Sequence, residues 1–187
     1  DPLGAGYAAL EANIGYGKNR KVRDGKFSKW VAFEPHVSHT GSNCDERYRV
    51  RSGDVIQAAL AIANEVSHLA GASSIPGAEQ FSAASVEDAL KLKSGTIHRI
   101  ASELWANRGQ GIVMAGEDEN LQIVANYLNS VLGNEGKTID GTVSPSKQSQ
   151  GSLADMLDLV ADMRAGKVDA LIVYGTNPAF SLPPLWA

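Results

Sequence analysis

Short apolar runs and longer amphipathic segments alternate along the chain, and this order limits the possible folds more than any other feature. The apolar runs cover residues 29–34, 111–116 and 169–175, each of which has the length of a strand. The segments between them place apolar residues at helical spacing. Apolar strands that alternate with helices are typical of a parallel sheet with helices on both faces. We therefore predict an α/β fold that is three-layered, Rossmann-like and built on a mostly parallel sheet.

Capping residues indicate where two of the helices begin and end. Asp54 is placed to be the N-cap of a helix that Gly71 ends, and Asp118 precedes a helix that Gly133 ends. The first of these helices is rich in Ala and Ile on most sides, so we expect it to be largely buried.

A turn-rich stretch, GASSIPGAEQFSAAS, separates the first helix from the rest of the chain. We take it as a domain boundary, with residues 1–80 forming a first, partial α/β lobe and residues 81–187 a second. The sequence starts at Asp1 without a methionine and stops in an apolar tail, which we interpret as a piece cut from a longer polypeptide.

The charge balance and the cysteine count argue against several function classes. The net charge is −4 with both signs spread along the sequence, which gives no electrostatic case for binding nucleic acid or an anionic membrane surface. No apolar run approaches the roughly 18 residues of a membrane span. With Cys44 as the single cysteine, neither an intrachain disulfide nor an iron–sulfur cluster held by several thiolates can form.

The loop from Glu34 to Asp45 is the first candidate site, because it follows a predicted strand and is rich in reactive side chains. One interpretation is a metal site, although the spacing matches no standard zinc pattern; its ligands would be His36, His39, Cys44 and Asp45. The other is a polar loop whose side chains hydrogen-bond the backbone. In either case the loop lies at the carboxyl end of a strand, where ligands bind in open α/β sheets, so we predict a pocket wall.

The stretch GQGIVMAGEDEN holds glycines that suggest a dinucleotide-binding fingerprint, but their order is wrong. Gly109 and Gly111 precede the strand, whereas the glycines of the fingerprint follow it and open the helix. The acids at 117–119 complement the helix dipole and would repel a phosphate that needed the same amides. A simple N-cap at Asp118 is therefore favoured over pyrophosphate binding.

The third candidate is the turn Gly175–Pro178, which follows the last apolar run. Asn177 can donate and accept hydrogen bonds, and the turn lies where ligands bind in this fold class. A plain turn that uses Pro178 fits the sequence equally well. A serine hydrolase is disfavoured, because the pattern G-x-S-x-G is absent.

These loops together resemble the molybdopterin-dependent oxidoreductase family. Active members tend to show D-P-R-x-[ST]-x-T-A-x-x-A-D after a strand, and then [RK]-P-G-T-D at the start of a helix. This chain reads E-P-H-V-S-H-T-G-S-N-C-D and then R-S-G-D, and the positions that fit or nearly fit are Glu34, Pro35, Ser38, Thr40, Asp45, Arg51, Gly53 and Asp54. The second half is similar to the family's strand–helix unit ending in L-G-N-x-G-K and to its strand ending in G-x-N-P.

Within the family, the chain most resembles the molybdopterin-like, cofactor-free part of the large iron–sulfur subunit of bacterial alternative complex III. This resemblance implies two lobes like the family's central domains and a non-catalytic scaffold role among the other subunits of a membrane-bound respiratory complex. It implies a periplasmic or otherwise extracytoplasmic location. The chain would hold no cofactor and no metal, and the iron–sulfur clusters would lie elsewhere in the parent protein. His36 stands where active enzymes often have arginine, and a neutral imidazole cannot grip a phosphate bidentately.

The resemblance also leaves an alternative open, in which the chain is a genuine binding domain for molybdopterin guanine dinucleotide. Glu34, Ser38 and Thr40 would then line one arm of the cofactor. The other arm would be lined by Gly116, Glu117, Thr176 and Asn177. In that case the protein would supply orientation and hydrogen bonds, while molybdenum would carry the redox step.

Overall fold

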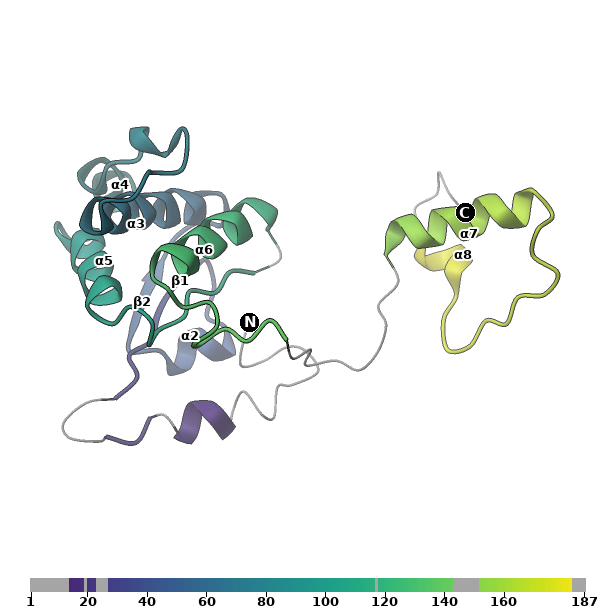
Figure 1. The fold of residues 1–187 in the computed structure, drawn as a ribbon, viewed down its shortest axis with the longest axis horizontal. Helices are drawn as coiled ribbons and strands as arrows, with labels where there is room; N and C mark the ends of the chain where they lie inside the picture. Colours follow the sequence, from purple (N-terminus) through teal and green to yellow (C-terminus); the bar gives the residue numbers. More distant parts are fainter. Residues whose placement is uncertain (1–13, 19, 23–26, 117, 143–151, 183–187) are drawn as a thin grey trace. The chain divides into compact units, whose positions relative to one another are not determined.

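The computed structural model describes residues 14–18, 20–22, 27–116, 118–142 and 152–182. The chain forms two compact units, Asp1–Pro145 and Ser146–Ala187, and both described strands lie in the first (Figure 1). Among the described residues, no helix has the length and apolar character needed to cross a bilayer.

Two parallel strands form the sheet of the first unit. β1 (Val31–Glu34) pairs with β2 (Glu46–Arg49), so that Val31 lies opposite Glu46 and Glu34 opposite Arg49. The short helix α2 (His39–Asn43) lies in the connection and lets the chain return in the same direction. The predicted α/β character is confirmed in outline, as a largely helical chain with a small parallel sheet.

The central helix of the first unit is α3 (Val55–Ala70), which follows the short 3-10 helix η1 (Ser52–Asp54). Its predicted boundaries are confirmed, because Asp54 occupies the N-cap and Gly71 the C-cap. Gly71 has a φ of 63°, a left-handed conformation that glycine adopts without a steric cost. The side chain of Asp54, however, makes no capping hydrogen bond.

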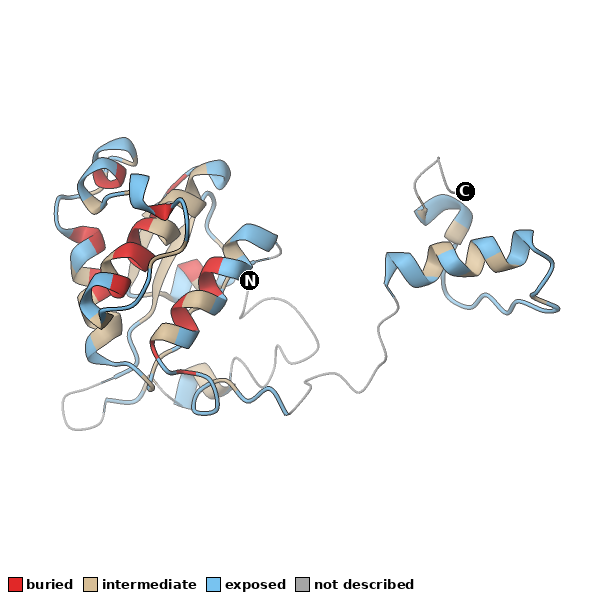
Figure 2. Cartoon of the chain, turned by 45° about the horizontal axis from the view of Figure 1, so that its top comes forward, coloured by how far each residue is buried: buried red, intermediate tan, exposed pale blue. Residues whose placement is uncertain are grey.

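The other helices of the first unit are η2 (Ala78–Gln80), α4 (Ala83–Ala89), α5 (Thr96–Ala106) and α6 (Glu119–Val131). α3 packs against both α5 and α6, and buried residues line their facing sides (Figure 2). Val66 of α3 and Ile97 of α5 have no exposed surface, and Leu128 of α6 joins the same core. The packing of α3 against α5 and α6 holds the helices of the first unit together around one core.

The shared core corrects the predicted boundary between residues 80 and 81. α3 precedes that boundary and α5 and α6 follow it, yet their apolar faces pack together. The division falls between Pro145 and Ser146 instead. Turn-forming residues mark a change of chain direction, and they do not distinguish a loop within one core from a link between two cores.

The predicted strands at residues 111–116 and 169–175 are not strands in the structure. In place of a neighbouring strand, the side-chain amide of Asn129 binds Val113, donating to its carbonyl at 2.8 Å and accepting from its N–H at 2.9 Å. A strand requires a partner strand, and the described sheet consists of β1 and β2 alone. For residues 111–116, the apolar composition therefore predicted an extended segment, but it did not predict that the side chain of Asn129 would be its partner.

The second unit contains α7 (Leu153–Arg164) and the single turn α8 (Pro178–Ser181). Ser152 and Asp155 form a capping box at the start of α7. None of the residues described in this unit is buried, as Figure 2 shows. In the run between the helices, Ile172 is 92% and Tyr174 94% exposed. These side chains form an exposed apolar run.

Candidate functional site

The predicted pocket-wall loop starts at the carboxyl end of β1, at the edge of the sheet where parallel strands present their ends together. Glu34 is the last residue of β1 and Ser38 is the N-cap of α2. The Ser38 hydroxyl donates to the Glu34 carboxylate at 2.6 Å and accepts from the N–H of Gly41 at 2.9 Å. The structure therefore brings these two predicted site residues into direct contact.

Arg47 of β2 completes the surroundings of Glu34. Its Nε donates to the carboxylate at 2.5 Å, and the N–H of Ser38 adds a longer bond of 3.3 Å. Burial by itself would raise the pKa of Glu34, but the hydrogen bonds from Ser38 and Arg47 outweigh it, so the pKa lies below its ordinary value. Glu34 is thus an ionised carboxylate whose partners belong to the protein itself.

Gly41 of α2 packs directly over this carboxylate. A Cβ at residue 41 would lie 1.7 Å from Oε1 of Glu34, well inside contact distance. The helix can approach so closely because glycine has no side chain. Thr40, the third predicted residue of this loop, is half-buried in the same helix.

Among the residues that the structure describes, no three His, Cys, Asp or Glu side chains gather where they could hold a metal ion. Asp45 is instead bound by Arg20 and by the N–H of Trp30, each at 2.8 Å, and the bond from Arg20 lowers the pKa of Asp45. Burial and the charge of Glu34 raise the pKa of the Cys44 thiol, which is therefore not activated as a nucleophile.

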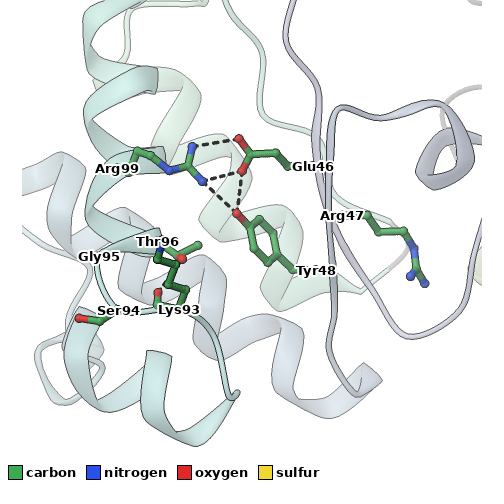
Figure 3. Close-up of a pocket in the computed structure, with 8 residues that line it drawn as sticks. All are labelled: Glu46, Arg47, Tyr48, Lys93, Ser94, Gly95, Thr96 and Arg99. Atoms are coloured by element: carbon green, nitrogen blue, oxygen red, sulfur yellow. Dashed lines mark hydrogen bonds and ion pairs between the residues drawn. The ribbon is translucent and has the colours of Figure 1, made fainter.

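A pocket of about 570 Å³ lies between β2 and the start of α5 (Figure 3). The residues that line it are Glu46, Arg47, Tyr48, Lys93, Ser94, Gly95, Thr96 and Arg99. None of them is among the predicted site residues. The signal that could have indicated this pocket is the alternation in E-R-Y-R, because successive strand residues face opposite sides of a sheet. Figure 3 shows Arg47 pointing away from the Glu46–Arg99 pair.

Arg99 is the centre of an ion-pair network that ties α5 to β2. Its guanidinium donates to Glu46 at 2.5 Å, and to the Tyr48 hydroxyl and Glu103 at 2.9 Å each. Lys29 lies 2.6 Å from Glu46 and 2.7 Å from Glu103. Burial alone would raise the pKa of Glu46, but bonds from Lys29, Tyr48 and Arg99 lower it to about 2. A carboxylate with so low a pKa is not suited to donate or accept a proton near neutral pH, so Glu46 lacks the properties of a general acid or base.

The N-terminus of α5, which borders the pocket, is closed by Glu87 of α4. This side chain belongs to a residue only 5% exposed, and it accepts from the N–H of Gly95 at 2.9 Å and of Ile97 at 2.7 Å. The helix amides that could bind a phosphate here already have an anionic partner. A second anion would also be repelled by the buried charge of Glu87.

The turn before α6 is closed in a similar way. Asp118 accepts from the N–H of Leu121 at 2.9 Å, which confirms its predicted role as N-cap. The side chain of Gln122 donates to the carbonyl of Ala115 at 3.1 Å and to that of Gly116 at 2.7 Å. The polar groups of this turn therefore bind one another. Glu117 lies outside the described residues.

Thr176 and Asn177 belong to the second unit, and both side chains are exposed. Asn177 takes the N-cap position of α8, where its carbonyl accepts from the N–H of Phe180 at 3.1 Å. Its side chain makes no capping bond. Pro178 follows as the first helical residue, a position that suits its missing N–H. The turn is thus present, and a ligand contact of its side chains stays a prediction.

Two arginines lie at the carboxyl end of β2, on the same edge of the sheet as Glu34. Arg49 and Arg51 are exposed, and neither forms an ion pair or a side-chain hydrogen bond with any other residue that the structure describes. Arg51 directly precedes η1 and the start of α3, where the side chain of the N-cap residue Asp54 makes no capping bond to the backbone and accepts from the side chain of Gln57 at 3.3 Å instead. These are the cations at this edge that internal partners leave available.

Comparisons of the chain with protein-family models, with curated proteins and with solved structures find no match. The assignment of a function therefore rests on the resemblance of the motifs and on the geometry of the residues described above.

Proposed function

We propose that the chain is a non-catalytic, molybdopterin-oxidoreductase-like domain that acts as a scaffold within a membrane-associated electron-transfer complex. The observation that carries the proposal is the closed Glu34–Ser38–Arg47 cluster. Two residues that would line a cofactor arm bind each other and a neighbouring strand, so their donors and acceptors are already used. A loop fixed in this way holds the end of the sheet rigid, as a scaffold requires, and offers few groups to a ligand.

The helix N-termini support the same proposal. α5 receives the carboxylate of Glu87 and α6 that of Asp118, so each of these helix N-termini already has a carboxylate at amides that a phosphate could use. A guanine-dinucleotide pterin would bring a pyrophosphate to loops of this kind. We further propose that the sheet extends beyond β1 and β2 to the three-layered, Rossmann-like arrangement that the sequence predicts.

The exposed apolar run of the second unit supports the expected partners. Its side chains are exposed by 50%, 92%, 48% and 94%, in the order Leu171, Ile172, Val173 and Tyr174. Surfaces of this kind are typical of contact with another protein segment. Other subunits of a respiratory complex, on the extracytoplasmic side of the membrane, are the partners that the resemblance implies.

The test is an elemental and pterin analysis of the native protein that contains this sequence, purified without denaturant. Iron without molybdenum, tungsten or pterin is the result that we expect. Molybdenum or tungsten in stoichiometric amount, together with a released pterin, would overturn the scaffold proposal. Isolation with intact partner subunits is the matching control, because it shows that the preparation has not lost a labile component.

One observation favours the second candidate, a genuine pterin-dinucleotide-binding domain. Arg49 and Arg51 are exposed cations at the carboxyl edge of the sheet that have no side-chain partner among the described residues, and arginine binds phosphate bidentately. Guanosine diphosphate is a probe for the nucleotide half of such a cofactor. Saturable binding by calorimetry that Arg51→Ala weakens and Arg108→Ala does not would support this candidate. A heat of mixing no larger than the heat of dilution would count against this candidate.

A further inference from the structure

The segment Gly111–Gly116 has two edges that differ in their hydrogen bonds. Residues 111, 113 and 115 have their carbonyls bound by side chains. Thr138 donates to Gly111 at 2.6 Å, Asn129 to Val113 at 2.8 Å, and Gln122 to Ala115. Asn129 also accepts from the N–H of Val113. An amide can bind both groups of one residue in this manner where the chain is extended, as in a β-ladder.

The opposite edge of this segment is open. The N–H and C=O groups of Ile112 and Met114 form no hydrogen bond with any residue that the structure describes. In an extended chain these groups point away from those of Val113. The side chains alternate in the same way, since Ile112 is 49% and Met114 57% exposed, while Val113 packs against the core. The segment therefore has the form of a strand with one free edge.

Within the part of the chain that the structure describes, β1 has a free edge as well. Glu46 donates its N–H to the carbonyl of Trp30, and Val50 to that of Glu34, so the even-numbered residues of β1 face β2. The odd-numbered residues, Val31 and Phe33, therefore direct their backbone groups to the other side. The side chains of both pack against the same core as Val113. The two open edges thus belong to segments that pack against the same core in the same unit.

We propose that Gly111–Gly116 closes onto the free edge of β1 as a third, parallel strand. In this arrangement the N–H groups of Val31, Phe33, Ile112 and Met114 enter the ladder, and the Asn129–Val113 pairing on the far edge is retained. Closure places Gly116 beside Glu34, since the carboxyl ends of parallel strands share one edge. The proposed pairing therefore brings together Glu34 and Gly116, two predicted site residues on separate segments. It does not depend on the binding of a cofactor.

Amide hydrogen exchange of the whole chain, followed by NMR, tests the proposal. The N–H of Val113 is the internal control, because it is bonded in both arrangements. We expect the amides of Phe33, Ile112 and Met114 to exchange at least about 100-fold more slowly than in an unstructured chain. Rapid exchange at these residues, with the Val113 amide protected, would overturn it.

A variant adds a second readout. Met114→Pro removes one donor of the proposed ladder while the exposed position tolerates the ring. We expect Phe33 to lose its slow exchange while the Ile97 amide in α5, bonded to Glu87, keeps it. Protection at Phe33 that survives the substitution would assign that protection to another partner and would also overturn the proposal.

Discussion

Gly41→Ala tests whether Glu34 is a structural carboxylate, since the two residues are in contact. The new Cβ would lie 1.7 Å from Oε1 and 2.4 Å from the carboxyl carbon, so the carboxylate has to move away. It then loses its bonds to Ser38 and Arg47, at a cost of about 1–3 kcal/mol for charge-assisted bonds of this kind. Alanine is better than glycine within a helix by about 0.5–1 kcal/mol, which offsets part of the loss. We expect a net destabilisation of about 0.5–2 kcal/mol.

A double-mutant cycle with Glu34→Ala, measured by urea denaturation, makes this prediction specific. Without the carboxylate there is nothing to displace, and Gly41→Ala should then stabilise the protein by about 0.5–1 kcal/mol. The change of sign between the two backgrounds is the diagnostic result. Gly53→Ala is the control, because a Cβ there meets no atom within 4 Å. If Gly41→Ala costs the same free energy in both backgrounds, the contact with Glu34 is not what constrains residue 41.

Three further predictions concern single side chains of the first unit. Because the pKa of Glu46 is lowered from 4.5 to about 2, its ion pairs stabilise the fold above pH 4.5 and are lost as the pH falls through about 2. Glu46→Gln should therefore flatten the loss of unfolding free energy over that interval in an acid titration, and an unchanged slope would contradict the assignment. Asn129→Leu leaves the backbone of Val113 without its partner and should lower the unfolding free energy by about 1–3 kcal/mol, whereas the exposed Asn126→Leu should not. Glu87→Ala removes the hydrogen-bond acceptor of two amides at the start of α5 and should lower the unfolding free energy by about 1–2 kcal/mol. The exposed Glu79→Ala is the matched control. If the two substitutions lower the unfolding free energy equally, Glu87 does not act as a cap.

The helices could be predicted because their signals are local. Asp118 caps α6 and Gly71 ends α3 where the sequence places them, since a cap depends on residues within one turn. The same locality explains the wrong domain boundary. A run of turn-forming residues has the same sequence pattern whether or not the helices on either side share a core. The packing of α3 against α5 and α6 depends on residues far apart in the sequence, so the pattern does not show it.

The strands and the site depended on distant residues, and there the sequence was less informative. The apolar run at residues 111–116 is extended, but its contact with Asn129 could not be foreseen from composition. Glu34 and Ser38 were predicted as neighbours of a pocket from their position after a strand. Arg47 reaches Glu34 diagonally, because the register of β1 and β2 places Arg47 opposite Ala32, and no motif specifies this register. The pocket beside Arg99 was missed for the same reason.

Amide exchange beside the Glu34–Ser38 pair can also distinguish the scaffold from the pterin-binding candidate, which an activity assay cannot do. A cofactor group that took the Ser38 hydroxyl would remove the N-cap of α2, which costs about 1 kcal/mol, and would leave Glu34 held by Arg47 and by the longer bond from the N–H of Ser38. Cofactor binding at this loop is therefore coupled to a change in α2. If the chain is a scaffold, the amide of Gly41 keeps the same exchange rate in the isolated protein and in the assembled complex. If it binds a pterin there, that amide exchanges faster in the loaded protein than in the free one, and Ser38→Ala abolishes the difference.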